Sequence, residues 1–488
     1  MAQRVLVRTY GCQMNVHDTE KVENLLLHHG WTLAEDLDGA DFFVINTCSI
    51  REKAEHTLYS DLGRLREWKQ AQPGRVLAVG GCVAQQEGDT LLRRFAHVDF
   101  VFGTHNLRWV PAMAAAARGG ERQVRVEETA SLERFDLPER HPDYVGATPG
   151  RAFVTVMEGC DMFCSFCIVP RTRAREISRP ADSIVVEAGQ LASLGVREIT
   201  LLGQTVNAYG RHDLRRAEAR RSRGGAADGA LGTVDFASLL RRLAAVPGLA
   251  RLRYTSPHPV FFDDALIRAH GEIEALCPHV HLPVQSGSDP VLERMRRRYT
   301  RADYVRIAAG LRAARPELVM TSDLIVGFPG ETDDDFRATL ELVREVGLVD
   351  SFSFKYSPRP GTTAVELPDA VAPELAQARL EELQTLQRQQ TLDYHRSRVG
   401  EEVEVLVSGE SRRGGQHSGR DLAHRVVNFE IPPDAVVEPG DFVRVRIVEA
   451  SPHSLIGVLA EPPGSVRTSL KPRLGAADEG IRIQGLPG

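Results

Sequence analysis

Six of the seven cysteines in this 488-residue chain fall into two groups of three, and each group has the side chains to bind a metal. Cys160, Cys164 and Cys167 lie in "GCDMFCSFC", directly after the apolar segment "AFVTVME". This spacing is too crowded for ligands on a helix or a strand, but a loop can wrap three thiolates around one cubic iron–sulfur cluster. Structural zinc takes four ligands, and the nearest fourth candidate, Asp161, lies between the first two cysteines. The pattern therefore favours iron–sulfur chemistry over zinc.

The second group is spread along the first part of the chain. Cys12 in "TYGCQMN", Cys48 in "INTCSIREKA" and Cys82 in "AVGGCVAQQ" each follow an apolar, strand-like segment. Open α/β sheets hold their ligands in a crevice beyond the carboxyl ends of the strands. We therefore expect these three thiols to converge on one point, again with three ligands rather than four. Cys277 fits a small core residue at a helix end and receives no ligand role.

The elements that must position the second group alternate between apolar strands and helical stretches. This alternation predicts an open α/β domain over residues 4–120. The chain then loses periodicity and gathers proline, glycine and charge, so a linker is expected over 121–145. The expected strands are 4–10, 41–47 and 75–81, and the expected helices are 18–29 and 51–70.

A longer run of strand and helix pairs predicts a βα barrel or partial barrel over residues 146–380. Active sites of such barrels lie at the C-terminal ends of the strands, where "GQTVN", "SPHP", "VQSGS" and "GFPGET" each follow an apolar segment. A single helix is expected near 289–315. Residues 211–232 are charged, rich in alanine and glycine, and aperiodic, which predicts a disordered surface insertion.

The last part of the chain contains short strands separated by turn signals, preceded by a long helix near 373–398. This pattern predicts a small all-β barrel, with its leading helix, over residues 381–460. The tail at 461–488 is rich in proline and glycine and is expected to be disordered. The predicted fold class is therefore α/β, with a small all-β barrel at the C-terminus.

The composition, 42% hydrophobic and 26% charged, is that of an ordinary soluble globular protein. No apolar run reaches the roughly 20 residues of a membrane span, and the start lacks the order of a signal peptide. We therefore expect a cytoplasmic protein whose cysteines serve metal binding or catalysis rather than disulfides. The net charge of -6 gives no overall attraction to nucleic acid, so an RNA partner would need local basic patches.

The cysteine loop after the first strand of a βα barrel resembles the radical S-adenosylmethionine superfamily. The resemblance implies that Cys160, Cys164 and Cys167 hold three irons of a [4Fe–4S] cluster. It also implies that the amino and carboxylate groups of S-adenosylmethionine chelate the fourth iron. An electron would then cleave the sulfonium and leave a 5′-deoxyadenosyl radical, chemistry that no side chain supplies. The cosubstrate would thus be the missing ligand.

Over residues 4 to about 460 the chain resembles the methylthiotransferase family, with a terminal barrel that resembles a TRAM domain. The motifs are specific and include "TYGCQMNVHDTEK", "NTCSIREKAE", "EGCDMFCSFCIVPRTRARE" and "SDLIVGFPGET". The resemblance implies a second, auxiliary [4Fe–4S] cluster on Cys12, Cys48 and Cys82, where sulfur binds and is methylated. "YGCQMN" and "RVVNF" are most similar to enzymes that methylthiolate carbon 2 of N6-isopentenyl (dimethylallyl) adenosine beside the tRNA anticodon, using two S-adenosylmethionine per turnover.

The alternatives within the same family are a ribosomal-protein aspartate and threonylcarbamoyl adenosine as targets. From another class, a non-catalytic iron–sulfur or zinc protein that binds RNA remains open. The residues expected to line the S-adenosylmethionine pocket could also be ordinary strand-to-helix turns. They are Gly203, Gln204, Asn207, Gln285, Ser286 and Ser288.

The resemblance implies a tRNA substrate, an electron donor of the reductase or flavodoxin type and a sulfur donor. We expect a monomer without a membrane partner. Two arginine clusters near the predicted barrel mouth could contact RNA phosphates, although such clusters are often solvated faces. They comprise Arg171, Arg173, Arg175, Arg294, Arg296, Arg297, Arg298 and Arg301.

Overall fold

The computed structural model describes residues 3–49, 52–129, 131–141, 144, 148–215, 234–411, 414–432 and 435–460. The predicted tail at 461–488 and most of the predicted insertion, residues 216–232, lie outside the described residues. Within the described part of the chain, no helix combines the length and the apolar character needed to cross a membrane.

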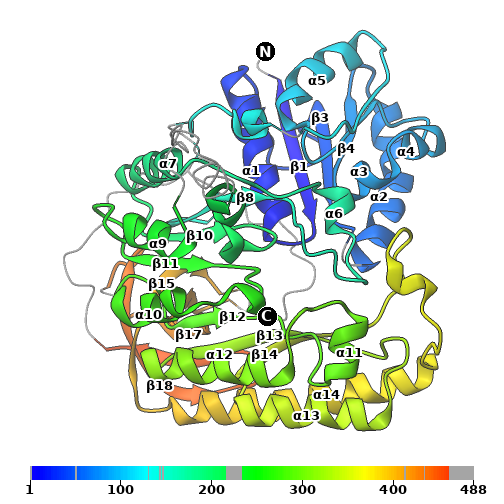
Figure 1. Ribbon diagram of the computed structural model, residues 1–488. Coiled ribbons are helices and arrows are strands. Elements are labelled where there is room, and N and C mark those ends of the chain that lie inside the picture. The colour runs from blue at the N-terminus through cyan, green and yellow to red at the C-terminus, as the bar shows by residue number, and fades with distance from the viewer. Residues whose placement is uncertain are drawn as a thin grey trace, which may run out of the picture.

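The first part of the chain forms one parallel sheet in the order β2-β1-β3-β4-β5-β6 (Figure 1). Its central strands are fully buried apolar runs because helices cover both faces of the sheet. Side chains alternate between two separate cores, so that Phe42 packs under one face and Phe43 under the other. The strands are β1 (Arg4–Tyr10), β2 (Thr32–Leu33), β3 (Phe42–Thr47), β4 (Val76–Gly81), β5 (Phe100–Phe102) and β6 (Gln123–Arg125).

Helices α1 (Gln13–His28) and α5 (Val110–Arg118) share one of these cores. The other core is closed by α2 (Glu52–Ala71), α3 (Cys82–Glu87) and α4 (Asp89–Arg94). Strand β6 extends this sheet although it falls in the segment expected to be a linker. Residues 138–141 of that segment run along α1, where Asn24 Nδ2 donates to the carbonyl of Glu139 at 3.1 Å.

The second part of the chain builds two three-stranded parallel sheets, β11-β10-β7 and β12-β13-β14. A bridge between Leu252 and Leu276 joins them into one curved, partial barrel around a large apolar core. The strands are β7 (Arg151–Thr155), β10 (Glu198–Leu202), β11 (Arg251–Tyr254), β12 (His279–His281), β13 (Val319–Val326) and β14 (Asp350–Lys355). The covering helices are α7 (Ala181–Ser193), α9 (Phe236–Ala244), α10 (Asp264–Glu272), α12 (Arg301–Ala314) and α13 (Asp333–Val346). The predicted fold class is confirmed.

The prediction of one helix near 289–315 is wrong. The chain forms α11 (Asp289–Arg294), then a turn, then α12. Arg296 and Arg298 in the turn have φ of 57° and 59°, a left-handed conformation that ends a helix. Thr300 then starts α12 with a capping box in which its side chain accepts from the Asp303 N–H. The turn directs Arg297 inward, where only 5% of it is exposed.

A long helix, α14 (Pro373–Ser397), follows the barrel and lies against α13 and β14 (Figure 1). It leads into a closed five-stranded barrel with its own apolar core, in the order β15-β16-β17-β19-β18. These strands are β15 (Glu402–Glu410), β16 (His417–Arg420), β17 (Val426–Glu430), β18 (Phe442–Ala450) and β19 (Leu455–Leu459). The predicted small all-β barrel is therefore present.

Candidate iron–sulfur and cosubstrate site

The three dispersed cysteines all lie at the carboxyl ends of neighbouring strands. Cys12 precedes α1, Cys48 directly follows β3, and Cys82 is the first residue of α3. Tyr10 pairs with Thr47 and Thr47 with Gly81, so the three strands end in the same row of the sheet. The order of the sheet reverses direction between β1 and β3, and open α/β sheets bind ligands at such a switch point.

Two glycines allow the backbone to close around these thiols. A Cβ on Gly11 would lie 2.5 Å from Cys48 Cβ. Gly81 has φ of 94°, and a Cβ there would lie 2.4 Å from both Asn46 Oδ1 and the Thr47 carbonyl. Any other residue at either position would push the cysteine-bearing loops apart.

A pair of buried asparagines fixes the loops behind the thiols. Asn15 accepts from Cys12 Sγ at 3.3 Å, and its Nδ2 reaches Asn46 Oδ1 at 3.3 Å. Asn46 Nδ2 in turn donates to the Asn15 carbonyl at 2.8 Å. Sequence reasoning missed both residues, although their places in "GCQMN" and "INTC" beside the cysteines were a usable signal.

Charge at this site comes from Arg173, which belongs to the barrel and not to the first sheet. Its guanidinium pairs with the buried Asp18 carboxylate. The hydrogen bond with Cys48, helped by the charge of Arg173, lowers the pKa of Cys12 to about 6. Burial raises the pKa of Cys82, and Arg173 opposes that rise. Arg173 is 2% exposed, which corrects its sequence-based interpretation as an RNA phosphate contact.

Several buried polar atoms around the thiols lack a hydrogen-bond partner among the described residues. They are Thr47 Oγ1, Ser49 Oγ, Asp18 Oδ1 and Arg173 Nη1. Such orphaned atoms are costly unless a bound group satisfies them. Thr47 Oγ1, Ser49 Oγ and Arg173 Nη1 are donors, and three thiols beside such donors fit an iron–sulfur cluster, whose sulfurs accept hydrogen bonds.

The barrel cysteines lie in the loop after β7 and β8 (Met157–Glu158), ahead of the short helix α6 (Val169–Thr172). Cys160, Cys164 and Cys167 share one apolar cluster that contains Met162 and packs against Phe166, Val169 and Phe261. Burial raises the pKa of Cys160, and it raises the pKa of Cys167 to about 12. Because burial favours the protonated form of these thiols, they become thiolates when they bind a metal.

Two residues that sequence reasoning did not assign to the cluster bond directly to these sulfurs. Thr205 Oγ1 lies 3.0 Å from Cys160 Sγ, and Arg297 Nη1 donates to Cys164 Sγ at 3.4 Å. Arg297 is held by the Tyr299 hydroxyl and by the Pro283 carbonyl. Its interpretation as an RNA phosphate contact is therefore wrong, because its charge is buried beneath the cysteine loop.

The residues expected to line the cosubstrate pocket differ in what they contact. Gln204 Oε1 accepts from the Gly159 N–H beside Cys160, while its buried Nε2 has no partner among the described residues. Asn207 exchanges two hydrogen bonds with the His258 backbone, at 2.9 and 2.8 Å. Gly203 packs so closely on Met157 that a Cβ would lie 2.6 Å from Met157 Cγ.

The "QSGS" turn packs onto α13. Ser286 Oγ lies 3.3 Å from Thr339 Oγ1, and Ser288 Oγ donates to Asp335 Oδ1. Gln285 is buried and adopts φ of 75°, a strained conformation for a residue other than glycine. Ser286 and Ser288 thus hold the turn, which matches the alternative of an ordinary strand-to-helix connection.

His258 is a further buried group near the cysteine loop. Its Nδ1 accepts from the Val260 N–H at 3.3 Å, so the neutral ring carries its proton on Nε2. Burial keeps the pKa of His258 well below its usual value, and the charges of Arg297 and Arg298 act in the same direction. Nε2 has no acceptor among the described residues. The ring lies against Phe261, which packs on the cysteine cluster, and against Tyr299, whose hydroxyl accepts from Arg297 Nε.

Within the described ranges, no three His, Cys, Asp or Glu side chains are arranged to hold one metal ion. A four-iron cluster imposes a different geometry, because each thiolate binds its own iron at a separate corner.

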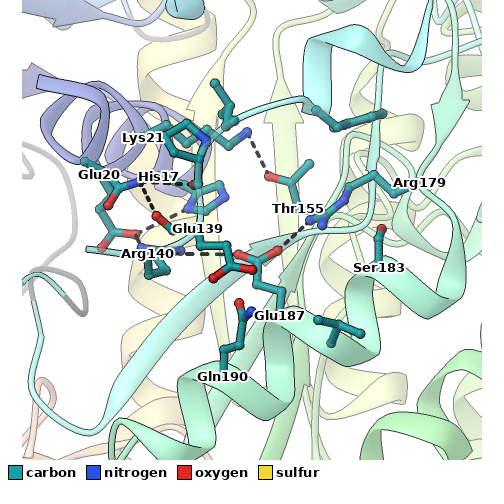
Figure 2. Close-up of a pocket in the computed structure, with 15 residues that line it drawn as sticks. His17, Glu20, Lys21, Glu139, Arg140, Thr155, Arg179, Ser183, Glu187 and Gln190 are labelled. Atoms are coloured by element: carbon teal, nitrogen blue, oxygen red, sulfur yellow. Dashed lines mark hydrogen bonds and ion pairs between the residues drawn. The ribbon is translucent and has the colours of Figure 1, made fainter. Parts of the chain in front are cut away.

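A polar cavity of 270 Å³ lies elsewhere, between α1, the segment 135–140 and α7 (Figure 2). None of the six cysteines lines it. Arg140 donates to the Phe153 carbonyl at 2.9 Å and Arg179 to the Thr155 carbonyl at 2.8 Å, which satisfies the open edge of β7. Both arginines also pair with Glu187, so the charges that surround the cavity balance one another.

Comparison with protein families divides the chain into three matches. Residues 4–103 match the uncharacterized protein family UPF0004, residues 154–343 the radical SAM superfamily, and residues 396–460 the TRAM domain. The fold is similar to that of the radical S-adenosylmethionine methyltransferase TsrM from Kitasatospora setae. That comparison has a TM-score of 0.50 at 14% identity and covers 75% of each chain.

Similar curated proteins span nearly the whole chain. The tRNA-2-methylthio-N(6)-dimethylallyladenosine synthase of Geobacter metallireducens is 47% identical over 454 residues, covering 93% of this chain and 98% of its own length. The Geobacter sulfurreducens protein of the same name is 45% identical over 461 residues, covering 94% and 98%. The resemblance identified from the motifs is thus confirmed, and the chain belongs to the tRNA-2-methylthio-N(6)-dimethylallyladenosine synthase family of the radical SAM superfamily.

Proposed function

We propose that this enzyme methylthiolates carbon 2 of N6-isopentenyl (dimethylallyl) adenosine beside the tRNA anticodon, using two S-adenosylmethionine molecules per turnover. The observation that carries the proposal is the pair of three-thiol groups at strand ends, each one ligand short of a four-iron cluster. Relatives at 47% and 45% identity that are named for this reaction support it.

Two [4Fe–4S] clusters are the proposed cofactors, together with S-adenosylmethionine. A cluster with S-adenosylmethionine at its open iron supplies radical chemistry that amino-acid side chains lack. The chain's own residues keep the core thiols dry, since Phe166, Val169 and Phe261 pack against them. The proposed ligands are Cys160, Cys164 and Cys167 for the core cluster and Cys12, Cys48 and Cys82 for the auxiliary cluster.

We infer that Gln204 and His258 bind S-adenosylmethionine through Nε2 donors that the described residues leave unpaired. Carboxylate and ribose oxygens are suitable acceptors for such donors. Asn207, Ser286 and Ser288 act through the turns that they hold, and Gly203 allows close backbone approach. Gln285 stays a proposed contact because it is buried in the same strained turn.

The proposed partners are tRNA, an electron donor of the reductase or flavodoxin type and a sulfur donor, with the enzyme acting as a monomer. A tRNA substrate implies a cytoplasmic enzyme. The TRAM match supports RNA binding. The exposed arginines of the two clusters near the cysteine loop are the proposed phosphate contacts, namely Arg171, Arg175, Arg294, Arg296 and Arg298.

Mass spectrometry of tRNA nucleosides tests the substrate directly. A strain without the corresponding gene should lose the 2-methylthio adduct of N6-isopentenyl adenosine and regain it when this chain is expressed. Expression of the Cys12→Ala variant should leave N6-isopentenyl adenosine without its methylthio group. Restoration of a methylthio group only on threonylcarbamoyl adenosine, or only on a ribosomal-protein aspartate, would transfer the proposal to that target.

A further inference from the structure

Arg173 links the two cysteine groups although it lies in the barrel. It follows α6, immediately after the cysteine loop, and its side chain ends beside Cys82 and Asp18 of the first domain. The segment that follows β5 makes hydrogen bonds to this part of the backbone. Thr104 Oγ1 donates to the Thr172 carbonyl at 2.7 Å, and His105 Nε2 lies 3.2 Å from the Arg173 carbonyl.

The ion pair that Arg173 makes is buried and incomplete. Nη2 contacts Asp18 Oδ2, and the exposed fractions of the two residues are only 2% and 0%. Nη1 and Asp18 Oδ1 are both buried without a partner among the described residues. Leaving Nη1 bare is costly, so an acceptor bound at the thiols would stabilise this pair.

The other charged side chains near Arg173 already have partners of opposite charge. Although burial alone would raise the pKa of Glu158, the charges of Lys21, Arg173 and Arg134 lower it to about 2. Lys21 Nζ lies 3.2 Å from Glu158 Oε1, and Arg134 Nη1 lies 3.9 Å from Oε2. Glu158 therefore has its own cations, while the charge of Arg173 also acts on Cys82, where it opposes the rise in pKa that burial causes.

We propose that Arg173 binds the anionic sulfur at the auxiliary cysteines through Nη1, and that Asp18 is the positioning residue that fixes the direction of the guanidinium. A guanidinium donates charge-assisted hydrogen bonds to anions, and its planar fork holds a fixed direction when one edge is paired. Thr47 Oγ1 and Ser49 Oγ, on either side of Cys48, supply further unpaired hydroxyls at the same site. The inference rests on the proposed function, since the sulfur in question is the one to be transferred.

Sulfide titration of the reconstituted full chain tests this role. A background with Cys160, Cys164 and Cys167 replaced by Ala leaves the auxiliary cluster as the one source of the electron paramagnetic resonance signal. Sodium sulfide should change that signal in the background protein. Arg173→Gln should weaken the apparent sulfide affinity by about tenfold or more, because it removes a charge-assisted hydrogen bond. Arg173→Lys should fall between the two, and Asp18→Asn should weaken binding less than Arg173→Gln.

Arg379→Gln is the matched control, because Arg379 of α14 is similarly buried and pairs with Glu331, which precedes α13, and with Asp333 of α13. It should leave sulfide affinity unchanged. Unchanged affinity in Arg173→Gln with full iron content would overturn the inference while leaving the proposed function intact. If Arg173→Gln fails to take up iron, Arg173→Lys decides by the same comparison. Absence of any sulfide response in the background protein would overturn the sulfur site of the proposed function itself.

Discussion

The buried guanidinium of Arg297 donates a hydrogen bond from Nη1 to the sulfur of Cys164 across 3.4 Å. Hydrogen bonds and positive charge beside a cluster thiolate stabilise the reduced cluster and raise its reduction potential. Replacing Arg297 by Gln should therefore make the core cluster harder to reduce and slow 5′-deoxyadenosine formation. Potentiometric titration followed by electron paramagnetic resonance measures the shift.

Arg298→Gln is the control for this change. Arg298 is exposed, whereas Arg297 is buried, so its replacement should leave the potential unchanged. Arg297→Lys keeps the positive charge, so its reduction potential should lie between those of the wild type and Arg297→Gln. An unchanged potential in Arg297→Gln with full iron content would contradict the expected role.

Replacing cysteines of the two groups should abolish different steps of the reaction. Alanine at Cys160, Cys164 or Cys167 should abolish 5′-deoxyadenosine formation, because the proposed electron-transfer cluster is lost. Alanine at Cys12, Cys48 or Cys82 should spare cleavage of S-adenosylmethionine and end methylthiolation. Chromatography of the reaction products with dithionite as reductant separates these outcomes. Full methylthiolation by a variant of the second group would exclude the auxiliary cluster.

Gly81→Ala should remove the auxiliary cluster selectively. The backbone of Gly81, with φ of 94° and ψ of -161°, lies in a region that essentially only glycine adopts and that costs another residue about 1–3 kcal/mol, and the new Cβ would also clash with the Thr47 carbonyl. Gly74→Ala is a matched control, since Gly74 has φ of 93° with nothing within 4 Å. Iron analysis should find about half the iron in Gly81→Ala and full iron in Gly74→Ala. Full iron in Gly81→Ala would contradict the expected clash, and an equal loss of iron in both variants would assign the loss to backbone strain.

The C-terminal barrel should detach when Glu198 is neutralised. This carboxylate, 1% exposed, lies 3.0 Å from Arg253 and near Arg151 and Arg251. These arginines donate to barrel carbonyls of Glu404, Leu406, Arg420 and Asp421. Glu198→Gln leaves buried cations unpaired and should cost about 3–5 kcal/mol. Faster hydrogen exchange in β15 and β16 would report it, and the exposed pair of Glu272 with Arg241 provides a control, Glu272→Gln, with little effect.

The same group gives a pH dependence. Burial alone would raise the pKa of Glu198. The charges of three arginines, Arg253, Arg151 and Arg251, instead lower this pKa from 4.5 to about 2. A carboxyl whose pKa is lower in the folded state than in the unfolded state stabilises the folded protein at pH values above its unfolded-state pKa. That contribution should shrink as the pH falls from 4.5 and vanish below about 2. Thermal unfolding of the wild type and Glu198→Gln should therefore converge with acid, and parallel pH curves would contradict the assignment.

The sequence alone determined the cysteine groups and the strands that carry them. Cys12, Cys48 and Cys82 could be assigned to strand ends because apolar runs and their connections are local patterns. The barrel cysteines were assigned by spacing within a single loop. Thr332 caps α13 through an equally local pattern, since its capping box with Asp335 spans only three residues.

Only the tertiary structure decided which polar side chains serve these cysteines. Arg173 and Arg297 lie in arginine-rich segments typical of a solvated or RNA-binding face, yet both are buried beside sulfur. Arg297 turns inward because the chain breaks between α11 and α12, and Arg173 reaches Asp18 across a sequence separation of 155 residues. Local patterns fix the elements, whereas a buried charge finds its partner through contacts that only the packed domains create.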